Sequence, residues 1–389
     1  MKKAQYKILV VDDEPDLEHL VRQRMRRDVR AGHYEFVFAY NGIEALEVLN
    51  ADPDIDMVLS DINMPRMDGL TLLEQMSQVD PDLRAVIVSA YGDMKNIRTA
   101  MNRGAFDFVT KPIDFQDLRV TIERTLEHLQ MWREAVASRD KLVALQNELR
   151  VAHEMQQSIL PKIFPNKPGY QLFGNMEPAR EVGGDFFDII NLENDCVGLA
   201  IADVSDKGVP AALFMMSSRT LMKGAAIGRS SPAEVLSEVN NLLQEDNDAA
   251  MFVTVFYAEY NPGSGVLSYA NGGHNPPIVV HADGSSTVLP QTNGIALGIM
   301  PDIEYEQNSV TLSPGDALVL YTDGVTEAMN AQNEEFEMER LCAVLSEHCS
   351  CDVREINQAV FQAVQAFAGD MPQFDDMTCM TLFCREIGI

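Results

Sequence analysis

The sequence predicts an α/β domain with a doubly wound parallel sheet, joined by a long helix to a layered α+β domain. Three observations predict this class. Apolar runs alternate with helical patterns through the first third of the chain, which is typical of a parallel sheet covered by helices. Residues 118–159 contain neither glycine nor proline and carry apolar residues at helical spacing. From Gly169 onward strand-like runs dominate, and the helical patterns are grouped apart from them.

Length and composition limit the classes of protein to consider. A chain of 389 residues fits two domains and a connector. Its net charge of −29 argues against a nucleic-acid backbone or an anionic membrane surface as a partner, so we expect neither nucleic acid nor membrane. The six cysteines form no Cys-x-x-Cys pair, and no signal peptide or long apolar stretch is evident. We therefore expect a soluble, cytoplasmic protein with reduced thiols.

The first domain, placed at residues 1–122, contains four short apolar runs that predict buried strands. The runs are Ile8–Val11, Met57–Ser60, Ala85–Val88 and Phe106–Val109. Helical patterns lie between them, for example at Asp16–Val29 and Gly42–Leu49. In a doubly wound sheet the functional site lies beyond the carboxyl ends of the strands. The residues that follow the runs there are Asp12, Asp13, Asp61, Ser89 and Lys111.

These strand-end residues suit the transfer of a phosphoryl group to an aspartate. Asp61 can act as the nucleophile, while Asp12 and Asp13 can hold Mg²⁺ together with the backbone carbonyl of Asn63. The cation would offset the charge of the incoming phosphoryl group.

Two more residues fit the same chemistry. Lys111 and the Ser89 hydroxyl can bind phosphoryl oxygens. The alternative is a nucleotide-binding or structural α/β domain in which the acids are only turn residues. Five suitable residues at five loop positions favour the phosphoryl acceptor.

Residues 5 to about 122 resemble a two-component receiver domain. The motifs that carry the resemblance are Asp12-Asp13, Asp61-x-x-Met64-Pro65-x-Met67-Asp68-Gly69, Ser89-Ala90 and Lys111-Pro112. The resemblance implies that Asp61 is the phosphoacceptor and that a histidine kinase or phosphotransfer protein phosphorylates it. It also implies that Ser89 and Phe108 form the switch pair, and that the Lys111–Pro112 peptide bond is cis.

The connector, placed at residues 123–160, predicts a long helix with a tendency to form a coiled coil. Its apolar stripe changes phase near Arg139. The stripe runs through Leu118, Ile122, Leu129, Trp132 and Val136, and then through Leu142, Leu145, Leu149, Ala152 and Ile159. We expect a homodimer through this helix; the alternative is a helix packed on its own globular neighbour. Pro161, Pro165 and Pro168 end the helical pattern.

The second domain, placed at residues 161–389, predicts strands with two groups of helices. The expected strands are Cys196–Ala202, Met251–Glu259, Val266–Ala270, Ile278–Ala282, Ala317–Tyr321 and the run that begins at Met377. The expected helices are Pro210–Met222, Ser231–Leu243, Glu334–Ser346 and Asp352–Phe367.

Three aspartates of this domain, Asp203, Asp323 and Asp375, lie where apolar runs meet turns. A fourth, Asp185, follows Gly183-Gly184. Carboxylates gathered at one rim of a β core repel each other unless cations lie between them, and oxygen ligands suit Mg²⁺ or Mn²⁺. We expect these acids, with the backbone carbonyl of Val204, to hold two such ions about 3.5–4 Å apart that activate water against a phosphoryl group. Any single Asp-Gly pair would be ordinary turn chemistry.

Residues 150–389 resemble the metal-dependent (PPM, type 2C) serine/threonine phosphatases, in the bacterial SpoIIE/RsbU-like branch. The motifs in order are Gln156-Gln157-Ser158-Ile159-Leu160-Pro161, Glu181-Val182-Gly183-Gly184-Asp185-Phe186-Phe187-Asp188, Ala202-Asp203-Val204-Ser205-Asp206-Lys207-Gly208-Val209-Pro210-Ala211-Ala212-Leu213, Asn271-Gly272-Gly273-His274-Asn275-Pro276-Pro277, Tyr321-Thr322-Asp323-Gly324-Val325-Thr326-Glu327-Ala328 and Asp375-Asp376-Met377-Thr378.

This second resemblance implies a PPM-type fold in which Asp203 bridges both metal ions. It implies Asp375 rather than Asp376 as a ligand, because Asp375 takes the first place of the family's acidic pair. His274-Asn275 either touches substrate or belongs to a structural loop. The implied substrate is a phosphorylated anti-sigma-antagonist (STAS-like) protein in partner-switching signalling. The alternative function is an adaptor with an inactive phosphatase-like domain, although all four metal carboxylates are present here.

Overall fold

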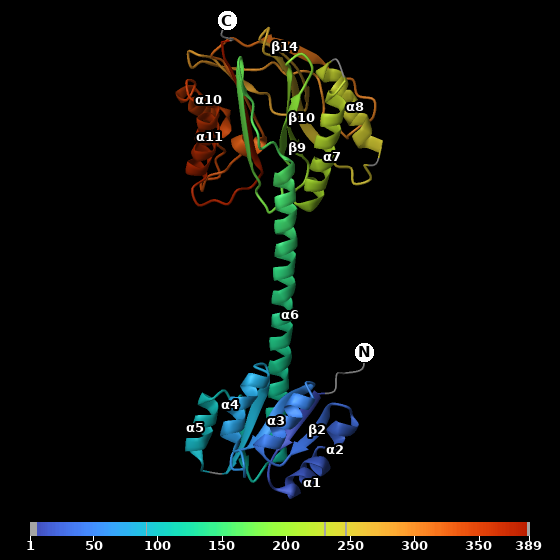
Figure 1. Cartoon of the computed structure of the whole chain (residues 1–389), viewed down its shortest axis with the longest axis vertical. Helices are drawn as coiled ribbons and strands as arrows, with labels where there is room; N and C mark the ends of the chain where they lie inside the picture. The colour runs from blue at the N-terminus through green and yellow to red at the C-terminus, as the bar shows by residue number, and fades with distance from the viewer. Residues whose placement is uncertain (1–5, 91, 229–230, 246, 387–389) are drawn as a thin grey trace. The chain divides into compact units, whose positions relative to one another are not determined.

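The computed structural model describes residues 6–90, 92–228, 231–245 and 247–386. The chain divides into two compact units, Met1–Ala144 and Leu145–Ile389. Helix α6 (Phe115–Ile159) is continuous across this division, so the change of apolar phase near Arg139 does not break it (Figure 1). The domain limit expected at residue 122 lies inside α6. The limit expected at residue 160 lies one residue beyond the end of this helix.

The first unit is built on a five-stranded parallel sheet in the order β2-β1-β3-β4-β5. Its strands are β1 (Tyr6–Val11), β2 (Tyr34–Ala39), β3 (Ile55–Asp61), β4 (Arg84–Ala90) and β5 (Asp107–Lys111). Its helices before α6 are α1 (Pro15–Arg24), α2 (Arg26–Arg30), α3 (Gly42–Ala51), α4 (Gly69–Val79) and α5 (Met94–Asn102). Helices α3, α4 and α5 share one apolar core with the sheet, and α1 and α6 share the other. The doubly wound class is therefore confirmed.

One predicted helix of this unit is wrong in its extent. The pattern Asp16–Val29 is two helices, α1 and α2, which are divided at Met25. Met25 leaves helical geometry at φ −93° and ψ 8°, and its side chain is fully buried in the core. The apolar pattern alone does not show this change of backbone geometry. Strand β2 was not among the expected strands.

Helix α6 has a buried beginning and an exposed middle. Leu118 and Ile122 from the predicted stripe are buried in the core of the first unit, as is Leu126, and Leu129 is also fully buried. Farther along, Leu142 is 62% exposed and Leu145 is 51% exposed. The first turns of α6 therefore pack on their own globular unit, whereas the second stripe begins with exposed leucines and ends at Ile159, which packs on the core of the second unit.

The second unit is a sandwich of two antiparallel sheets. One sheet has the order β14-β11-β10-β9-β8, and the other has the order β13-β12-β15-β16-β7-β6. Their strands are β6 (Asn166–Lys167), β7 (Tyr170–Glu177), β8 (Phe186–Asn191), β9 (Val197–Val204), β10 (Val253–Asn261), β11 (Val266–Gly272), β12 (Ile278–Val280), β13 (Ser286–Val288), β14 (Gln307–Thr311), β15 (Ala317–Tyr321) and β16 (Met377–Cys384). Apolar residues of both sheets form one core between them.

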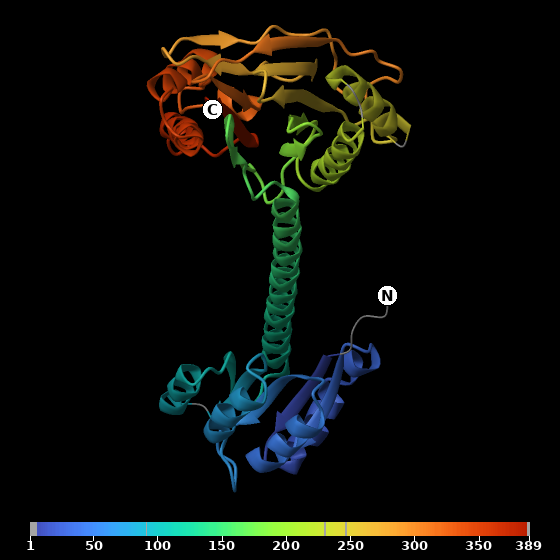
Figure 2. The same cartoon turned by 45° about the horizontal axis from the view of Figure 1, so that its top comes forward.

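Helices cover the two outer faces of this sandwich. Helices α7 (Val209–Ala226) and α8 (Pro232–Glu245) pack on the first sheet, and α10 (Glu337–Glu347) and α11 (Val353–Ala368) pack on the second. Figures 1 and 2 show these two helix pairs on opposite sides of the strands. The short helix α9 (Asp323–Thr326) follows β15. The layered α+β class is thus confirmed. In the part of the chain that the structure describes, no helix is long and apolar enough to cross a membrane.

We predict that the buried start of α6 stabilises the first unit. Leu129→Ala should lower the free energy of unfolding of this unit by about 2–5 kcal/mol, because a fully buried leucine leaves a cavity. The single tryptophan of the chain, Trp132, lies beside Asp82 of this unit, so its fluorescence during urea unfolding is the measurement.

Leu142→Ala is the matched control on the same helix. Because Leu142 is largely exposed, its truncation should change the unfolding free energy by less than about 0.5 kcal/mol. Equal losses in the two variants would contradict the division of α6 into a buried and an exposed part.

Candidate functional site

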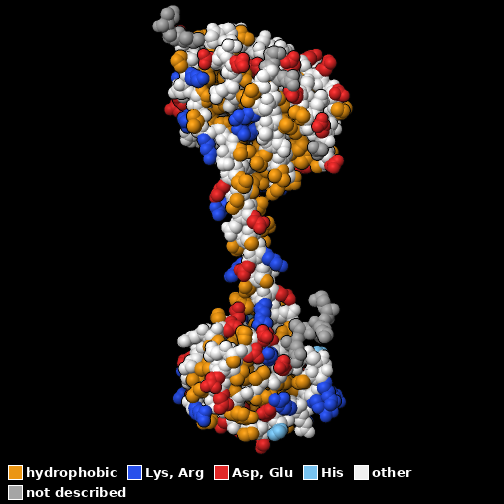
Figure 3. Space-filling view, turned by 45° about the vertical axis from the view of Figure 1, so that its right-hand side comes forward, with side chains coloured by type: hydrophobic (Ala, Val, Ile, Leu, Met, Phe, Trp, Pro, Cys, Tyr) orange, Lys and Arg blue, Asp and Glu red, His pale blue; other side chains and the backbone are white. Residues whose placement is uncertain are grey.

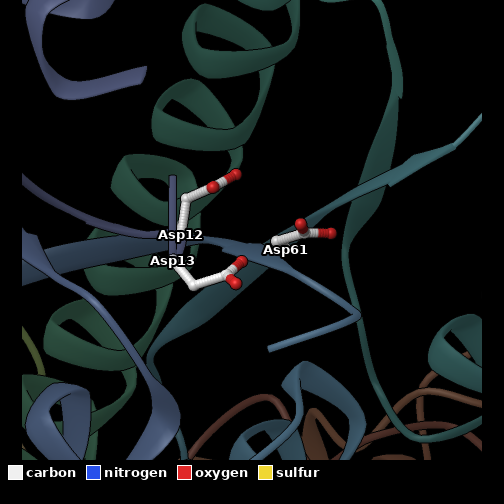
Figure 4. Close-up of side chains that lie close together, drawn as sticks. All are labelled: Asp12, Asp13 and Asp61. Carbon is white, nitrogen blue, oxygen red and sulfur yellow. The ribbon is translucent and has the colours of Figure 1, made fainter. Parts of the chain in front are cut away.

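The first candidate site lies at the carboxyl ends of adjacent strands β1 and β3. Asp12 and Asp13 follow β1, and Asp61 ends β3. One carboxylate oxygen from each of the three lies within 4.8 Å of the others, and Figure 4 shows the side chains around a common space. Asp12 and Asp61 are buried, whereas Asp13 is exposed, so the group opens to solvent on one side. An oxygen-only set of this kind suits Mg²⁺.

Lys111 enters this site from the end of β5. Its Nζ donates to Asp61 Oδ2 at 2.8 Å and to Asp12 Oδ2 at 2.9 Å. Burial alone would lower the pKa of Lys111, but its hydrogen bonds with the two carboxylates outweigh burial and raise it. The ammonium group therefore stays charged, and the Lys111–Pro112 bond that follows is cis, as the resemblance implied.

The remaining residues expected in this site lie on neighbouring strand ends. The backbone N–H of Asn63 donates to Asp61 Oδ1 at 3.4 Å. Ser89, on β4, is fully buried, and its hydroxyl has no hydrogen-bond partner among the described residues. Phe108 on β5 is 37% exposed. An unpaired buried hydroxyl is a group that a new acceptor would stabilise, although the switch role of these two residues stays a prediction.

The second candidate site begins with two facing carboxylates in the phosphatase-like unit. Antiparallel pairing of Phe186 with Ala202 brings Asp185, just before β8, beside Asp203 at the end of β9. Asp185 is almost completely buried. Burial and the charge of Asp203 raise the pKa of Asp185 well above its ordinary value. Burial and the charge of Asp323 raise the pKa of Asp203 to about 7.

Two threonines of the other sheet hold the Asp185 carboxylate. Thr322 Oγ1 and Thr378 Oγ1 each donate to Asp185 Oδ2 at 2.7 Å. Thr322 follows β15 and Thr378 lies in the neighbouring strand β16. Asp185 thus links the two sheets at one rim, and both of its hydroxyl donors fix the carboxylate rather than neutralise it. The two threonines were not singled out from the sequence, although each lies within a quoted motif.

The acidic pair Asp375-Asp376 divides into two roles. Asp376 is buried, and its carboxylate accepts hydrogen bonds from the backbone N–H groups of Ala179 at 2.7 Å and Gly184 at 2.6 Å. Asp375 is only partly buried, and its charge is the second cause, after burial, that raises the pKa of Asp323. Asp376 therefore holds backbone groups, and the preference for Asp375 as the cation ligand stays a prediction.

Lys207 is a neighbour of these acids that sequence reasoning missed. Its Nζ lies 2.9 Å from Asp375 Oδ2 and donates to the carbonyl oxygen of Phe374 at 2.6 Å. The lysine partly neutralises one side of the acidic site. In the sequence, only the position of this lysine in the motif around Asp203 could have indicated that it lies near the acids.

The donor set of this site fits divalent cations. The group consists of oxygens, the buried Asp185 lies beside the half-buried Asp203, and a Cβ on Gly184 would lie 3.0 Å from the Val204 carbonyl oxygen. The Val204 carbonyl therefore reaches the turn that carries Asp185. The fit is looser than in the first site, because Asp12, Asp13 and Asp61 are the one group of the described residues in which three ligand atoms come within 4.8 Å.

Two other motif residues have structural surroundings. His274 is buried, its Nδ1 lies 2.8 Å from Thr254 Oγ1, and burial lowers its pKa to about 4. Asp188 is buried and its carboxylate lies 3.0 Å from the Arg219 guanidinium on α7. Of the two possibilities for His274-Asn275, the buried position of His274 favours the structural loop.

Comparison with known families decides what the two units are. The response regulator receiver domain model matches residues 8–123, and the model for stage II sporulation protein E (SpoIIE) matches residues 193–384. The chain joins a receiver domain to a SpoIIE-type phosphatase domain. The chain is 28% identical over 268 residues to the phosphoserine phosphatase RsbU of Bacillus subtilis, which covers 69% of this chain and 79% of RsbU. It is 33% identical over 159 residues to the transcriptional regulatory protein GlrR of Escherichia coli, which covers 39% of this chain and 35% of GlrR.

Solved structures show the same fold for the phosphatase domain. The RsbU and RsbW domains of Rv1364c from Mycobacterium tuberculosis match with a TM-score of 0.51 and 25% identity, covering 58% of this chain and 62% of that one. The SiaA-PP2C domain of Pseudomonas aeruginosa matches with a TM-score of 0.55 and 23% identity, covering 62% of this chain and 97% of that one. The chain spans 41% of another relative, the protein IcfG of Synechocystis, at 32% identity over 264 residues, or 61% of this chain.

We predict that Asp203→Asn stabilises the phosphatase domain when divalent cations are removed with a chelator. The raised pKa means that the folded chain binds a proton between about pH 4 and pH 7 that the unfolded chain lacks, so this group's contribution to stability is lost as pH rises through that window. Asn carries no charge to be buried. At pH 8 the variant should exceed the wild type by roughly 1 kcal/mol or more in unfolding free energy, since one pKa unit is worth about 1.4 kcal/mol.

Thermal unfolding at pH 8 and pH 5 measures this effect. The advantage of Asp203→Asn should shrink at pH 5, and Asp206→Asn, an exposed neighbour in the same loop, should show none at either pH. A variant that is less stable than the wild type at pH 8 in chelator would show that Asp203 is not under electrostatic strain.

Proposed function

We propose that this protein is a response regulator in which phosphorylation of Asp61 controls a metal-dependent serine/threonine phosphatase. The observation that carries the proposal is the pair of facing carboxylates Asp185 and Asp203 at the junction of the two sheets, with Asp323 and Asp375 beside them. Folding brings these acids together although charge repulsion opposes it. Such an unfavourable electrostatic energy is expected where carboxylates are arranged to bind a cation.

The receiver residues have distinct roles in this proposal. Asp61 attacks the phosphoryl group that a histidine kinase or phosphotransfer protein supplies. Asp12 and Asp13, with the Asn63 carbonyl, would hold Mg²⁺. Lys111 is already placed against Asp61 and Asp12, so its ammonium group can follow the new negative charge. Ser89 offers an unpaired hydroxyl to a phosphoryl oxygen.

In the phosphatase domain, Asp185, Asp203, Asp323, Asp375 and the Val204 carbonyl would hold two Mn²⁺ or Mg²⁺ ions. When bound, such ions lower the pKa of water and offset charge on a phosphoryl group. The chain's own contribution is placement: Thr322 and Thr378 orient Asp185, and Asp376 fixes the backbone before it. Lys207, beside Asp375, supplies a further positive charge at the edge of the site.

The proposed substrate is a phosphoserine or phosphothreonine on a STAS-like anti-sigma antagonist, in a cytoplasmic partner-switching system. Support comes from the relative RsbU, which is named a phosphoserine phosphatase and which matches 69% of this chain. The adaptor alternative would have been favoured by the loss of a metal carboxylate, and all four are present.

The proposed assembly is a homodimer through the middle of α6. Figure 3 shows hydrophobic side chains exposed along this helix between charged ones. Leu142 and Leu145, three residues apart, lie on the same helical face and are more than half exposed. Burial of such a stripe against a second copy is the usual stabilisation of an isolated long helix.

We predict that the full chain with Mn²⁺ releases phosphate from a STAS-domain protein phosphorylated on serine. Asp203→Asn should reduce the rate by more than about a hundredfold. Loss of a direct metal ligand should lower the rate more than loss of a residue that only contacts a ligand. Asp206→Asn in the same loop should leave the rate nearly unchanged. Beryllofluoride on Asp61 should change the rate of the wild type but not that of Asp61→Asn.

Two outcomes of this assay contradict the proposal in different ways. A rate that beryllofluoride leaves unchanged in the wild type would show a phosphatase that ignores its receiver. No phosphate release in any state, despite bound metal, would make the protein an adaptor.

We predict that Leu142→Glu and Leu145→Glu together weaken self-association at least about tenfold in sedimentation equilibrium. The reason is that each exposed leucine loses apolar burial worth about 1.5–3 kcal/mol in a dimer. Val120→Glu, at a half-exposed site near the start of the same helix, is the control and should not alter association. A wild-type chain that stays monomeric at high concentration would refute the dimer.

A further inference from the structure

The last turns of α6 touch the loop that carries Asp185. Gln156 is 2% exposed and lies in the second unit, near the end of the helix. Its Nε2 donates to the carbonyl oxygen of Gly183 at 2.6 Å, and its Oε1 accepts from the N–H of the same glycine at 3.0 Å. One side-chain amide thus satisfies both backbone groups of the residue two places before Asp185.

The opposite side of this loop is held by Asp376. Its Oδ2 accepts from Gly184 N–H at 2.6 Å, and a Cβ on Gly183 would lie 2.4 Å from that same oxygen. The Gly183-Gly184 segment therefore lies closely between Gln156 and Asp376. Asp185 comes next, and its carboxylate is bound by the two threonines of the other sheet.

The helix end itself is fixed to the phosphatase core. Leu160, directly after α6, is buried in that core, and Ile159 packs against it. His153, one turn before Gln156, places Nδ1 2.7 Å from the carbonyl oxygen of Glu181. Two residues on one face of α6 thus contact two successive parts of the loop, and Gln156 makes the buried contact.

We propose that Gln156 is a positioning residue for the metal-binding carboxylate of Asp185. The inference rests on the proposed function for the role of Asp185, but the contact with Gly183 is independent of it. Without the side-chain amide, the Gly183 N–H and C=O are buried without partners, so the loop gains by moving toward water. Such a movement displaces Asp185 from Asp203. The affinity for metal then falls although every ligand is still present.

A plain helix-capping or packing role would behave differently. Such a role would change overall stability and leave metal affinity alone, since Gln156 touches no ligand itself. The discriminating readouts are therefore the dissociation constant for Mn²⁺ and the exchange rate of the Gly183 amide, neither of which requires catalysis.

The test uses the full chain carrying Asp12→Asn, which removes a ligand of the receiver site. Mn²⁺ binding is followed by electron paramagnetic resonance of free Mn²⁺, and amide exchange is followed by mass spectrometry of a peptide spanning residues 178–187. Gln156→Met, which keeps length but loses both hydrogen bonds, should bind Mn²⁺ about 10- to 100-fold more weakly, as outer-shell variants do. The peptide should exchange roughly tenfold faster, the factor expected for one lost buried hydrogen bond.

Gln157→Met is the matched control. Gln157 is the next residue along the chain, and its side-chain amide bonds to a residue other than Gly183. It should match the parent in both readouts. Gln156→Glu keeps the shape and the acceptor but loses the donor, so it should also weaken Mn²⁺ binding, and it replaces Gln156→Met if that variant does not fold.

Unchanged Mn²⁺ affinity in a folded Gln156 variant would overturn the proposal. Equal losses in the Gln156 and Gln157 variants would also overturn it, by assigning the effect to the helix end as a whole. If no protein in the series hydrolyses a phosphoprotein but the Gln156 variants alone lose Mn²⁺ affinity, the positioning role stands and the proposed enzymatic function fails.

Discussion

The structure of the phosphatase domain depends on one unfavourable interaction, the approach of the Asp185 and Asp203 carboxylates at the rim of the sandwich. Burial and the charge of Asp203 raise the pKa of Asp185, and burial and the charge of Asp323 raise that of Asp203. The surrounding residues act to hold this arrangement rather than to relieve it: Thr322 and Thr378 bind Asp185 from the second sheet, and Asp376 binds the backbone before it. Carboxylates held together in this way are the kind of ligand set that a hard cation would stabilise.

The receiver domain also holds carboxylates that repel each other, but it does so with a different arrangement of residues. Its three carboxylates lie closer together, and the Lys111 ammonium group lies between Asp12 and Asp61. This internal cation makes the receiver site stable before any phosphoryl group arrives. Among the described residues, Lys207 has one comparable ion pair in the phosphatase site, to Asp375, and no ion pair joins the more deeply buried Asp185 to a basic side chain. The two sites therefore differ in how much they depend on an added cation.

Sequence reasoning found the elements whose residues follow a strong local pattern. The strand Ala317–Tyr321 has the predicted limits, and the acids expected at strand ends lie there. Strand β2 was missed, and a single helix was expected where Met25 divides two, because the apolar pattern does not show how the buried Met25 packs in the core. Thr322, Thr378 and Lys207 were missed for a related reason: their roles come from contacts between residues far apart in the chain. The hydrogen bonds of Gln156 with Gly183 were likewise hidden, since nothing local connects residue 156 with residue 183.

The most direct test of this account is anomalous diffraction at the manganese edge from crystals of the full chain grown with Mn²⁺. The account predicts strong peaks bounded by Asp203 and its neighbours Asp185, Asp323 and Asp375, and their loss in Asp203→Asn. A peak at Asp12, Asp13 and Asp61 in the same crystals is the internal control for metal access. A receiver peak without density near Asp203 would contradict the claim that the buried carboxylates of the phosphatase domain form a cation site.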